Sequence, residues 1–231
     1  PLPEPTKNSL SKCKNVSFEN CKSLDGNIPN NLFQNCVDTN FSNTFNGCIS
    51  LTGEIPGELF SDCIDAGSFD GCFANWITSI PEDLFKNCTN ATTFKDCFRG
   101  CTSITKLPDN LFKNCTNVNS FMNCFYGCTS ITKIPNNLFE NCTKVNNFRG
   151  TFGNIQNLES IGNNIFKSEQ TVDFYQIFEG CYNLKNIPED LFKNCPNTRS
   201  FNCAFNRCTS LTEIPEGLFD NCKNVEDFYN T

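Results

Sequence analysis

A phenylalanine that ends a Leu-Phe dipeptide (Ile-Phe in one case) recurs along the chain every 25 to 27 residues. A period in this range is the signature of a repeat array, in which each unit buries its apolar side chains by stacking on its neighbours. This spacing therefore predicts a solenoid. The repeated residues are Phe33, Phe60, Phe85, Phe112, Phe139, Phe166, Phe192 and Phe219.

The 24 phenylalanines all fit this register, apart from Phe18 in an incomplete first coil. The second column contains Phe45, Phe73, Phe98, Phe125, Phe152, Phe178 and Phe205. The third contains Phe41, Phe69, Phe94, Phe121, Phe148, Phe174, Phe201 and Phe228. Because burying one Phe side chain contributes about 1.5–3 kcal/mol, three stacked columns would supply a continuous core.

Proline, glycine and asparagine recur at fixed places and predict local structure. Seven of the 11 prolines stand four residues before a first-column Phe, so P-x-x-L-F is expected to begin a short helical turn. Two sets of residues that tolerate a left-handed backbone are expected to end such turns. One set is Asn35, Asp62, Asn87, Asn114, Asn141, Ser168, Asn194 and Asn221; the other is Gly47, Asn75, Gly100, Gly127, Asn154, Gly180 and Arg207.

The segments between the turns are short and rich in Thr and β-branched residues, as in residues 101–107 and 115–121. They predict short strands or extended arches, and identical segments of successive coils are expected to pair in parallel. The expected fold is an α/β repeat solenoid of about eight stacked coils of about 27 residues. We expect residues 1–9 to be a linker or a processed N-terminal segment, and residues 10–231 to form one solenoid domain with partial terminal coils.

Most of the 18 cysteines also fall into columns, three residues after a first- or second-column Phe. At matched positions Trp76 and Ile155 replace cysteine, which suits a buried packing position better than a disulfide. We therefore expect mostly reduced, buried thiols. A few disulfides, within Cys97/Cys101 and Cys124/Cys128 or between adjacent coils, remain an alternative, and the absence of C-x-x-C and of histidine disfavours a zinc site.

Charge and composition exclude several classes of function. A net charge of −7 opposes binding to nucleic acid, and the chain has no histidine to act as a general base. No apolar run has the roughly 18 residues of a membrane span. Carboxylates such as Asp83 and Asp109 could serve a glycosidase, but they recur with the repeat and fit a solvated edge better. We expect no catalytic residue, metal or cofactor.

Six Asn-x-Ser/Thr sequons could accept N-glycans in a eukaryotic secretory pathway. They begin at Asn15, Asn40, Asn87, Asn90, Asn114 and Asn141. Several coincide with the asparagine repeated after the first Phe column, so repetition of a structural residue explains them at least as well.

The string F-x-G-C-T-S-[IL]-T-x-[IL]-P-x-x-L-F-x-N-C occurs in residues 98–115 and 125–142, and a close variant of it in 205–222. It resembles the repeat of BspA-like leucine-rich repeat surface proteins, and the resemblance extends from Cys13 onward. It implies a leucine-rich-repeat-like fold and a secreted or cell-surface protein. It also implies an adhesin-type role towards extracellular-matrix or host-cell partners, and carries over no catalytic residue.

Outward positions between the apolar anchors of one strand vary from coil to coil, as expected for a recognition surface on a fixed core. The candidate binding residues are Thr105, Lys106, Thr132, Lys133, Glu159, Ser160, Lys185, Asn186, Thr212 and Glu213. The expected ligand is a protein or glycoprotein on host cells or in the extracellular matrix. The alternative is a structural spacer or surface-layer component that self-associates through its C-terminal coil, around Phe219 to Phe228.

Overall fold

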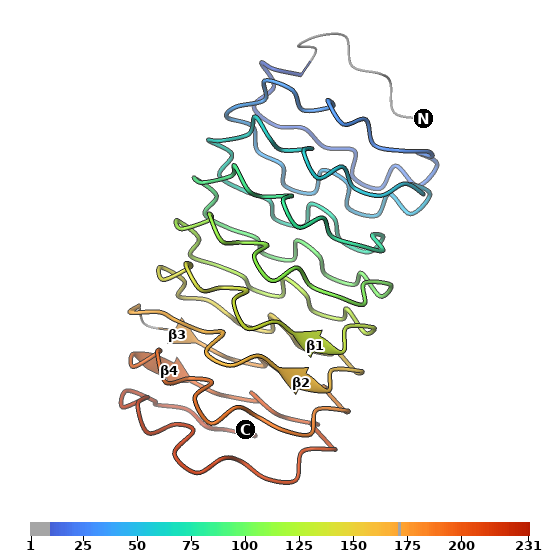
Figure 1. Cartoon of the computed structure of the whole chain (residues 1–231). Coiled ribbons are helices and arrows are strands. Elements are labelled where there is room, and N and C mark those ends of the chain that lie inside the picture. The colour runs from blue at the N-terminus through green and yellow to red at the C-terminus, as the bar shows by residue number, and fades with distance from the viewer. Residues whose placement is uncertain (1–9, 171) are drawn as a thin grey trace.

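The computed structural model describes residues 10–170 and 172–231. The expected linker, residues 1–9, lies outside the described residues. Figure 1 shows a solenoid whose colour passes from blue to red along the stack, so coils that follow one another in sequence are neighbours in space. The buried residues form one hydrophobic core that extends from Val16 to Cys222.

The strands are short and pair in parallel, as predicted, but residues 101–107 contain no strand and residues 115–121 contain only the single bridge of Ser120. β1 (Lys133–Ile134) pairs with β2 (Ser160–Ile161), and β3 (Val172–Asp173) pairs with β4 (Thr198–Ser200). Single bridges extend the β3 side of the stack through Ser68, Thr93, Ser120, Asn147 and Asp173. Each coil therefore contributes one short rung to a parallel ladder.

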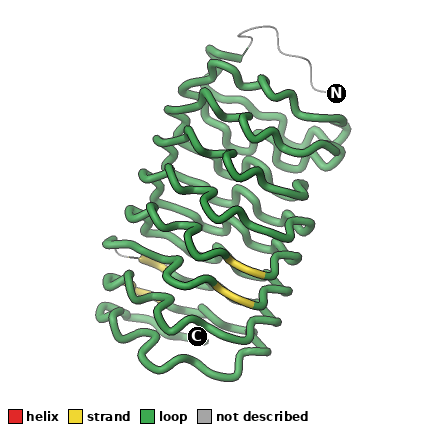
Figure 2. The backbone as a smooth tube through the Cα atoms, in the orientation of Figure 1, coloured by secondary structure: helices red, strands yellow, loops and turns green. Residues whose placement is uncertain are grey.

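The prediction of helical turns is wrong, because the described residues contain no helix (Figure 2). In residues 108–115 the bonds run from Leu111 N–H to Pro108, from Lys113 N–H to Asn110 and from Cys115 N–H to Phe112. Each bond joins residues three apart, but only every second N–H group in the segment makes one. A helix needs the intervening N–H groups to join the same series. The segment is therefore a chain of tight turns.

A second kind of turn follows the third Phe column, and we call it the turn ladder (residues 41–48, 69–76, 94–101, 121–128, 148–155, 174–181 and 201–208). In residues 94–101 alternate N–H groups bond to the next coil, as in Asp96 to Met122 at 2.8 Å and Gly100 to Tyr126 at 2.8 Å. The groups between them close turns within the coil. Inter-coil bonding thus takes the donors that a helix would use.

The second set of cap residues adopts the left-handed backbone, as predicted, with φ between 59° and 74°. Gly100, for instance, has φ of 70°, a conformation that residues with a side chain rarely adopt. Of the first set, only Asn35 among the described residues has a positive φ. The prediction for the others is wrong.

Asparagines of the first set instead join neighbouring coils. The Nδ2 groups of Asn87, Asn114 and Asn141 donate to the carbonyls of Ser61, Lys86 and Lys113 at 2.8–2.9 Å. This contact satisfies a carbonyl that the irregular turn leaves without a backbone partner. It gives the repeated asparagine a structural role.

A short polar residue precedes every third-column Phe, and its side chain accepts the N–H two residues further on. Asn147 accepts from Arg149 N–H at 3.0 Å, and Asp173 accepts from Tyr175 N–H at 2.8 Å. The same bond is made by Asn40, Ser68, Thr93, Ser120, Ser200 and Asp227. Such side-chain turns favour a bend over a continued strand, so each coil turns at the same point.

The Phe columns form three files of rings through the core. Successive rings in each file are near-parallel and have centroids 5.3–6.2 Å apart. Rings of the first and third files meet at an angle, as between Phe112 and Phe121 at 4.7 Å and 58°. Phe18 stacks on Phe45 and so begins the second file.

Truncating a ring inside a file is expected to destabilise the stack strongly. Phe121 is fully buried, so Phe121→Ala should lower the free energy of unfolding by about 3–5 kcal/mol. Phe228 occupies the same repeat position but is 47 % exposed, so Phe228→Ala should cost under about 2 kcal/mol. Urea unfolding followed by circular dichroism measures both. Equal losses would show that ring burial does not hold the coils together.

All 18 cysteines are free thiols, and 15 of them are buried, as the replacements by Trp76 and Ile155 predicted. Thiols of the second column donate to the Phe carbonyl of the preceding coil, as in Cys128 Sγ to Phe98 O at 3.0 Å. Burial raises the pKa of Cys101 to about 11 and that of Cys115 to about 12. The buried thiols therefore stay protonated near neutral pH.

Thiol labelling separates the buried cysteines from the accessible ones. A thiolate is the reactive form, so a neutral buried thiol should not react. In native protein a maleimide should label only Cys13, Cys21 and Cys203, which are exposed or half-buried. All 18 should react after unfolding. Peptide mapping checks this, and native labelling of Cys97 or Cys124 would contradict the packing.

The buried thiols also predict alkaline unfolding. Unfolded thiols ionise near pH 8.5, whereas burial keeps the native ones protonated, so stability is intact below that pH and falls above it. Above that pH each buried thiol lowers the free energy of unfolding by about 1.4 kcal/mol per pH unit. The combined loss for the 15 thiols exceeds the free energy of unfolding of a typical protein, about 5–15 kcal/mol. Circular dichroism in reductant should show cooperative unfolding between about pH 8.5 and 9.5. A structure unchanged to about pH 10 would contradict this.

Candidate binding surface

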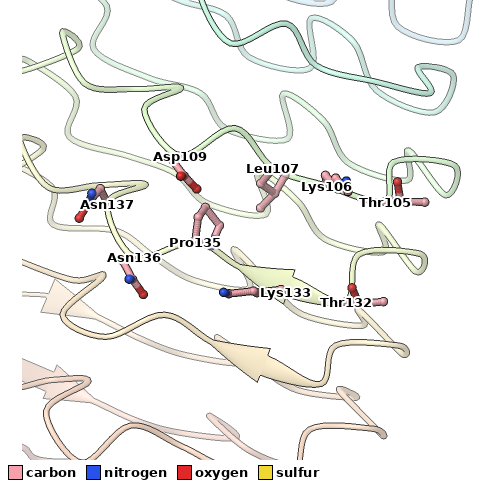
Figure 3. A pocket seen from close by; sticks show the side chains of 9 residues that line it. All are labelled: Thr105, Lys106, Leu107, Asp109, Thr132, Lys133, Pro135, Asn136 and Asn137. Atoms are coloured by element: carbon pink, nitrogen blue, oxygen red, sulfur yellow. The ribbon is translucent and has the colours of Figure 1, made fainter.

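A groove crosses the face that carries the predicted binding residues. One pocket of about 410 Å³ lies between adjacent coils (Figure 3). It is lined by Thr105, Lys106, Leu107, Asp109, Thr132, Lys133, Pro135, Asn136 and Asn137. A neighbouring pocket of about 440 Å³ shares Thr105, Lys106, Leu107 and Asp109 with it and continues to Thr78, Ser79, Ile80 and Glu82. The two form one groove over three coils.

The apolar anchors of the strand fix which side chains face this groove. Ile104 and Leu107 are buried, and the two residues between them, Thr105 and Lys106, are exposed. The next coil repeats the arrangement, with Thr132 and Lys133 exposed between Ile131 and Ile134. The repeat thus places equivalent outward side chains at the same position of adjacent coils.

Two lysines form the most highly charged part of the groove. Lys106 and Lys133 occupy the same position in adjacent coils, and neither takes part in an ion pair of the described residues. Ser79 precedes them and Ser160 follows them in this column, so no carboxylate lies within the column itself. Two positive charges side by side repel each other. An anionic group bound between the two ammonium groups would therefore relieve their repulsion.

The two walls of the groove differ in chemistry. Figure 3 shows Thr105 and Thr132 at one side, with Asp109, Asn136 and Asn137 at the other. Thr78 continues the threonine column into the neighbouring pocket, and Leu107, only 7 % exposed, provides apolar surface between the walls. One wall thus offers hydroxyl groups and the other offers amides and a carboxylate, and Lys106 and Lys133 lie between the two.

The structure brings four of the ten candidate residues into the groove: Thr105, Lys106, Thr132 and Lys133. The other six, Glu159, Ser160, Lys185, Asn186, Thr212 and Glu213, are exposed but line neither pocket. The contribution of Asp109, Asn136 and Asn137 could not be seen in the sequence, because these residues belong to the turns that follow residues 104–107 and 131–134. Their inclusion follows from how the turn folds back beside the strand.

Sequence reasoning missed a second variable surface, on the turn ladder. Arg99 lies over the ring of Tyr126 at 5.4 Å, and Arg149 lies over Tyr175 at 4.7 Å. Arg149 also pairs with Asp173 at 3.6 Å. Residues at these outward positions change in every coil, while the left-handed positions beside them keep the backbone fixed. Variable outward residues beside repeated Gly or Asn residues could have indicated this second surface in the sequence.

Trp76 is half-buried and contacts the rings of Phe45 and Phe73 at 6.3 Å, so it belongs to the edge of the core, as its cysteine position suggested. Phe228 and Tyr229, in the last coil, are 47 % and 68 % exposed. Self-association through this coil stays a prediction.

No group of three or more potential metal ligands comes together in the part of the chain that the structure describes. Within residues 10–170 and 172–231, no helix is long and apolar enough to cross a membrane.

Six copies of the BspA type leucine-rich repeat region match the chain over residues 26–230. This is fewer than the expected number of about eight coils, and the exact number stays a prediction. No match was found among curated protein sequences.

Several solved structures are similar to the chain. A leucine-rich repeat protein from Bacteroides ovatus is 20 % identical, with a TM-score of 0.37, over 91 % of this chain and 69 % of its own length. The APL1 leucine-rich repeat domain is 10 % identical, with a TM-score of 0.49, over 96 % of this chain and 56 % of its own. A chain of the Drosophila Toll–Spatzle complex is 19 % identical, with a TM-score of 0.32, over 88 % of this chain and 31 % of its own. At these values the likenesses assign no function.

Proposed function

The chain belongs to the BspA-type leucine-rich repeat family, and from this premise we propose that it is a non-enzymatic module that binds a protein partner through the groove across residues 78–80, 105–109 and 132–137. The proposal rests chiefly on the groove itself. It combines exposed polar side chains with a scaffold held rigid by stacked rings. A rigid site loses little conformational freedom when it binds, which favours affinity.

The proposed setting is the cell surface or the secreted fraction, with an adhesin-type role towards a host-cell or matrix protein or glycoprotein. The family assignment supports this setting. The acidic balance of the chain also suits a protein ligand better than nucleic acid, because a net charge of −7 repels phosphate backbones.

Filling the groove with bulky side chains tests the proposal. The double variant Thr105→Trp/Thr132→Trp should block the groove without disturbing the buried anchors beside it. Binding to a panel of purified matrix glycoproteins and to intact cells is measured by biolayer interferometry and flow cytometry. We expect at least one ligand to bind the unmodified protein and to lose at least about tenfold in affinity with the double variant.

The matched control is Thr212→Trp, which changes the same repeat position outside the groove. It should leave binding unchanged. A ligand that binds all three proteins equally would place recognition elsewhere and would contradict the proposal. The turn-ladder surface around Arg99 and Tyr126 would then be the next surface to alter.

A further inference from the structure

We propose that the groove recognises an extended acidic peptide segment, whose carboxylates lie over Lys106 and Lys133. This inference rests on the proposed function and adds the chemical class of the ligand. The observation that carries it is the pair of exposed lysines at the same position of adjacent coils, neither of which takes part in an ion pair of the described residues.

The groups around the lysines strengthen the preference for an acceptor-rich ligand. Thr78, Thr105 and Thr132 form a column of exposed hydroxyls beside Lys106 and Lys133. Hydroxyl and ammonium groups donate hydrogen bonds to carboxylate oxygens, and such charge-assisted bonds are stronger than neutral ones. This side of the groove is therefore complementary to a row of carboxylates.

The opposite wall argues for a peptide over a sulfated polysaccharide. Asp109 and Glu82 line the groove across from the threonines, so an anion on that side of the ligand would be repelled. A sulfated chain carries charge on several sides. An extended peptide can place acidic residues at i and i+2 on one side, about 6.7 Å apart, and keep neutral residues towards Asp109.

The lysine side chains can meet this spacing. They occupy the same position of adjacent coils, and the lysine side chain is long and flexible. Leu107 and Pro135 lie between the two walls and can receive an aliphatic side chain of the ligand. The favoured sequence pattern is therefore an acidic residue at every second position, with neutral or apolar residues between.

The experiment uses a fluorescent peptide with Glu at every second position, and a matched peptide with Gln in place of each Glu. Fluorescence anisotropy measures their binding to the full chain at about 50 mM and about 300 mM NaCl, because screening weakens exposed charge pairs. The Glu peptide should bind, and bind less tightly at the higher salt. The Gln peptide should bind at least about tenfold more weakly.

The protein variants use a matched lysine pair. Lys106→Ala/Lys133→Ala should weaken binding of the Glu peptide about tenfold. Lys86→Ala/Lys113→Ala removes the same charge from two exposed lysines, also one coil apart, where Lys86 pairs with Asp83 at 3.9 Å. It should change binding by less than about twofold. Thermal unfolding of both variants confirms that they remain folded.

Three results would overturn the inference. If the two double variants weakened binding of the Glu peptide equally, the effect would come from the overall charge of the protein and not from Lys106 and Lys133. A heparin-derived oligosaccharide that binds as tightly as the peptide, and depends on Lys106 and Lys133, would identify a sulfated glycan as the ligand. A protein ligand blocked by Thr105→Trp/Thr132→Trp but indifferent to Lys106→Ala/Lys133→Ala would overturn the acidic-peptide assignment and leave the proposed function standing.

Discussion

The stacking of phenylalanine rings between successive coils is the interaction on which the rest of the structure depends. No coil contains a helix or a long strand that could fold alone, and the longest strand in the described residues has three residues. Each coil gains its core only by covering the rings of its neighbour, as Phe112 does between Phe85 and Phe139 at 5.8 Å. The regular backbone bonds between coils then fix the distance at which the rings meet.

This arrangement separates the residues that build the stack from those that face solvent. Inside positions keep Phe, Cys and aliphatic residues, and most left-handed positions keep Gly or Asn. Outward positions such as 105, 106, 132 and 133 are free to change, because neither ring stacking nor inter-coil bonding depends on their side chains. A surface can therefore acquire a particular charge pattern, here a lysine pair in an acidic chain, while the core stays unchanged.

Much of the fold could be predicted from the sequence. Phenylalanines that recur every 25 to 27 residues can all be buried only if successive coils share one core. The burial of the cysteines could be predicted because large apolar residues, Trp76 and Ile155, stand at cysteine positions in other coils. The helical turns could not be excluded, because P-x-x-L-F suits a helix start. In residues 108–115 only every second N–H closes a turn, and nothing in the sequence indicates this. Part of the groove could be predicted, because the sequence pattern places Lys106 and Lys133 at outward positions. Asp109 and Asn136 could not be predicted, because they line the groove only as a result of how the following turn folds.

The most direct test of the stacking account is to excise one coil. Deleting residues 108–134 removes one full period and joins Leu107 to Pro135, so the ring of Phe139 should stack on that of Phe85. The account predicts that this shortened protein folds, keeps the circular dichroism spectrum of the parent and unfolds cooperatively at a somewhat lower temperature. A control that lacks only residues 108–117 breaks the register and should not fold. Failure of the full-period deletion to fold, or equal tolerance of both deletions, would contradict the account.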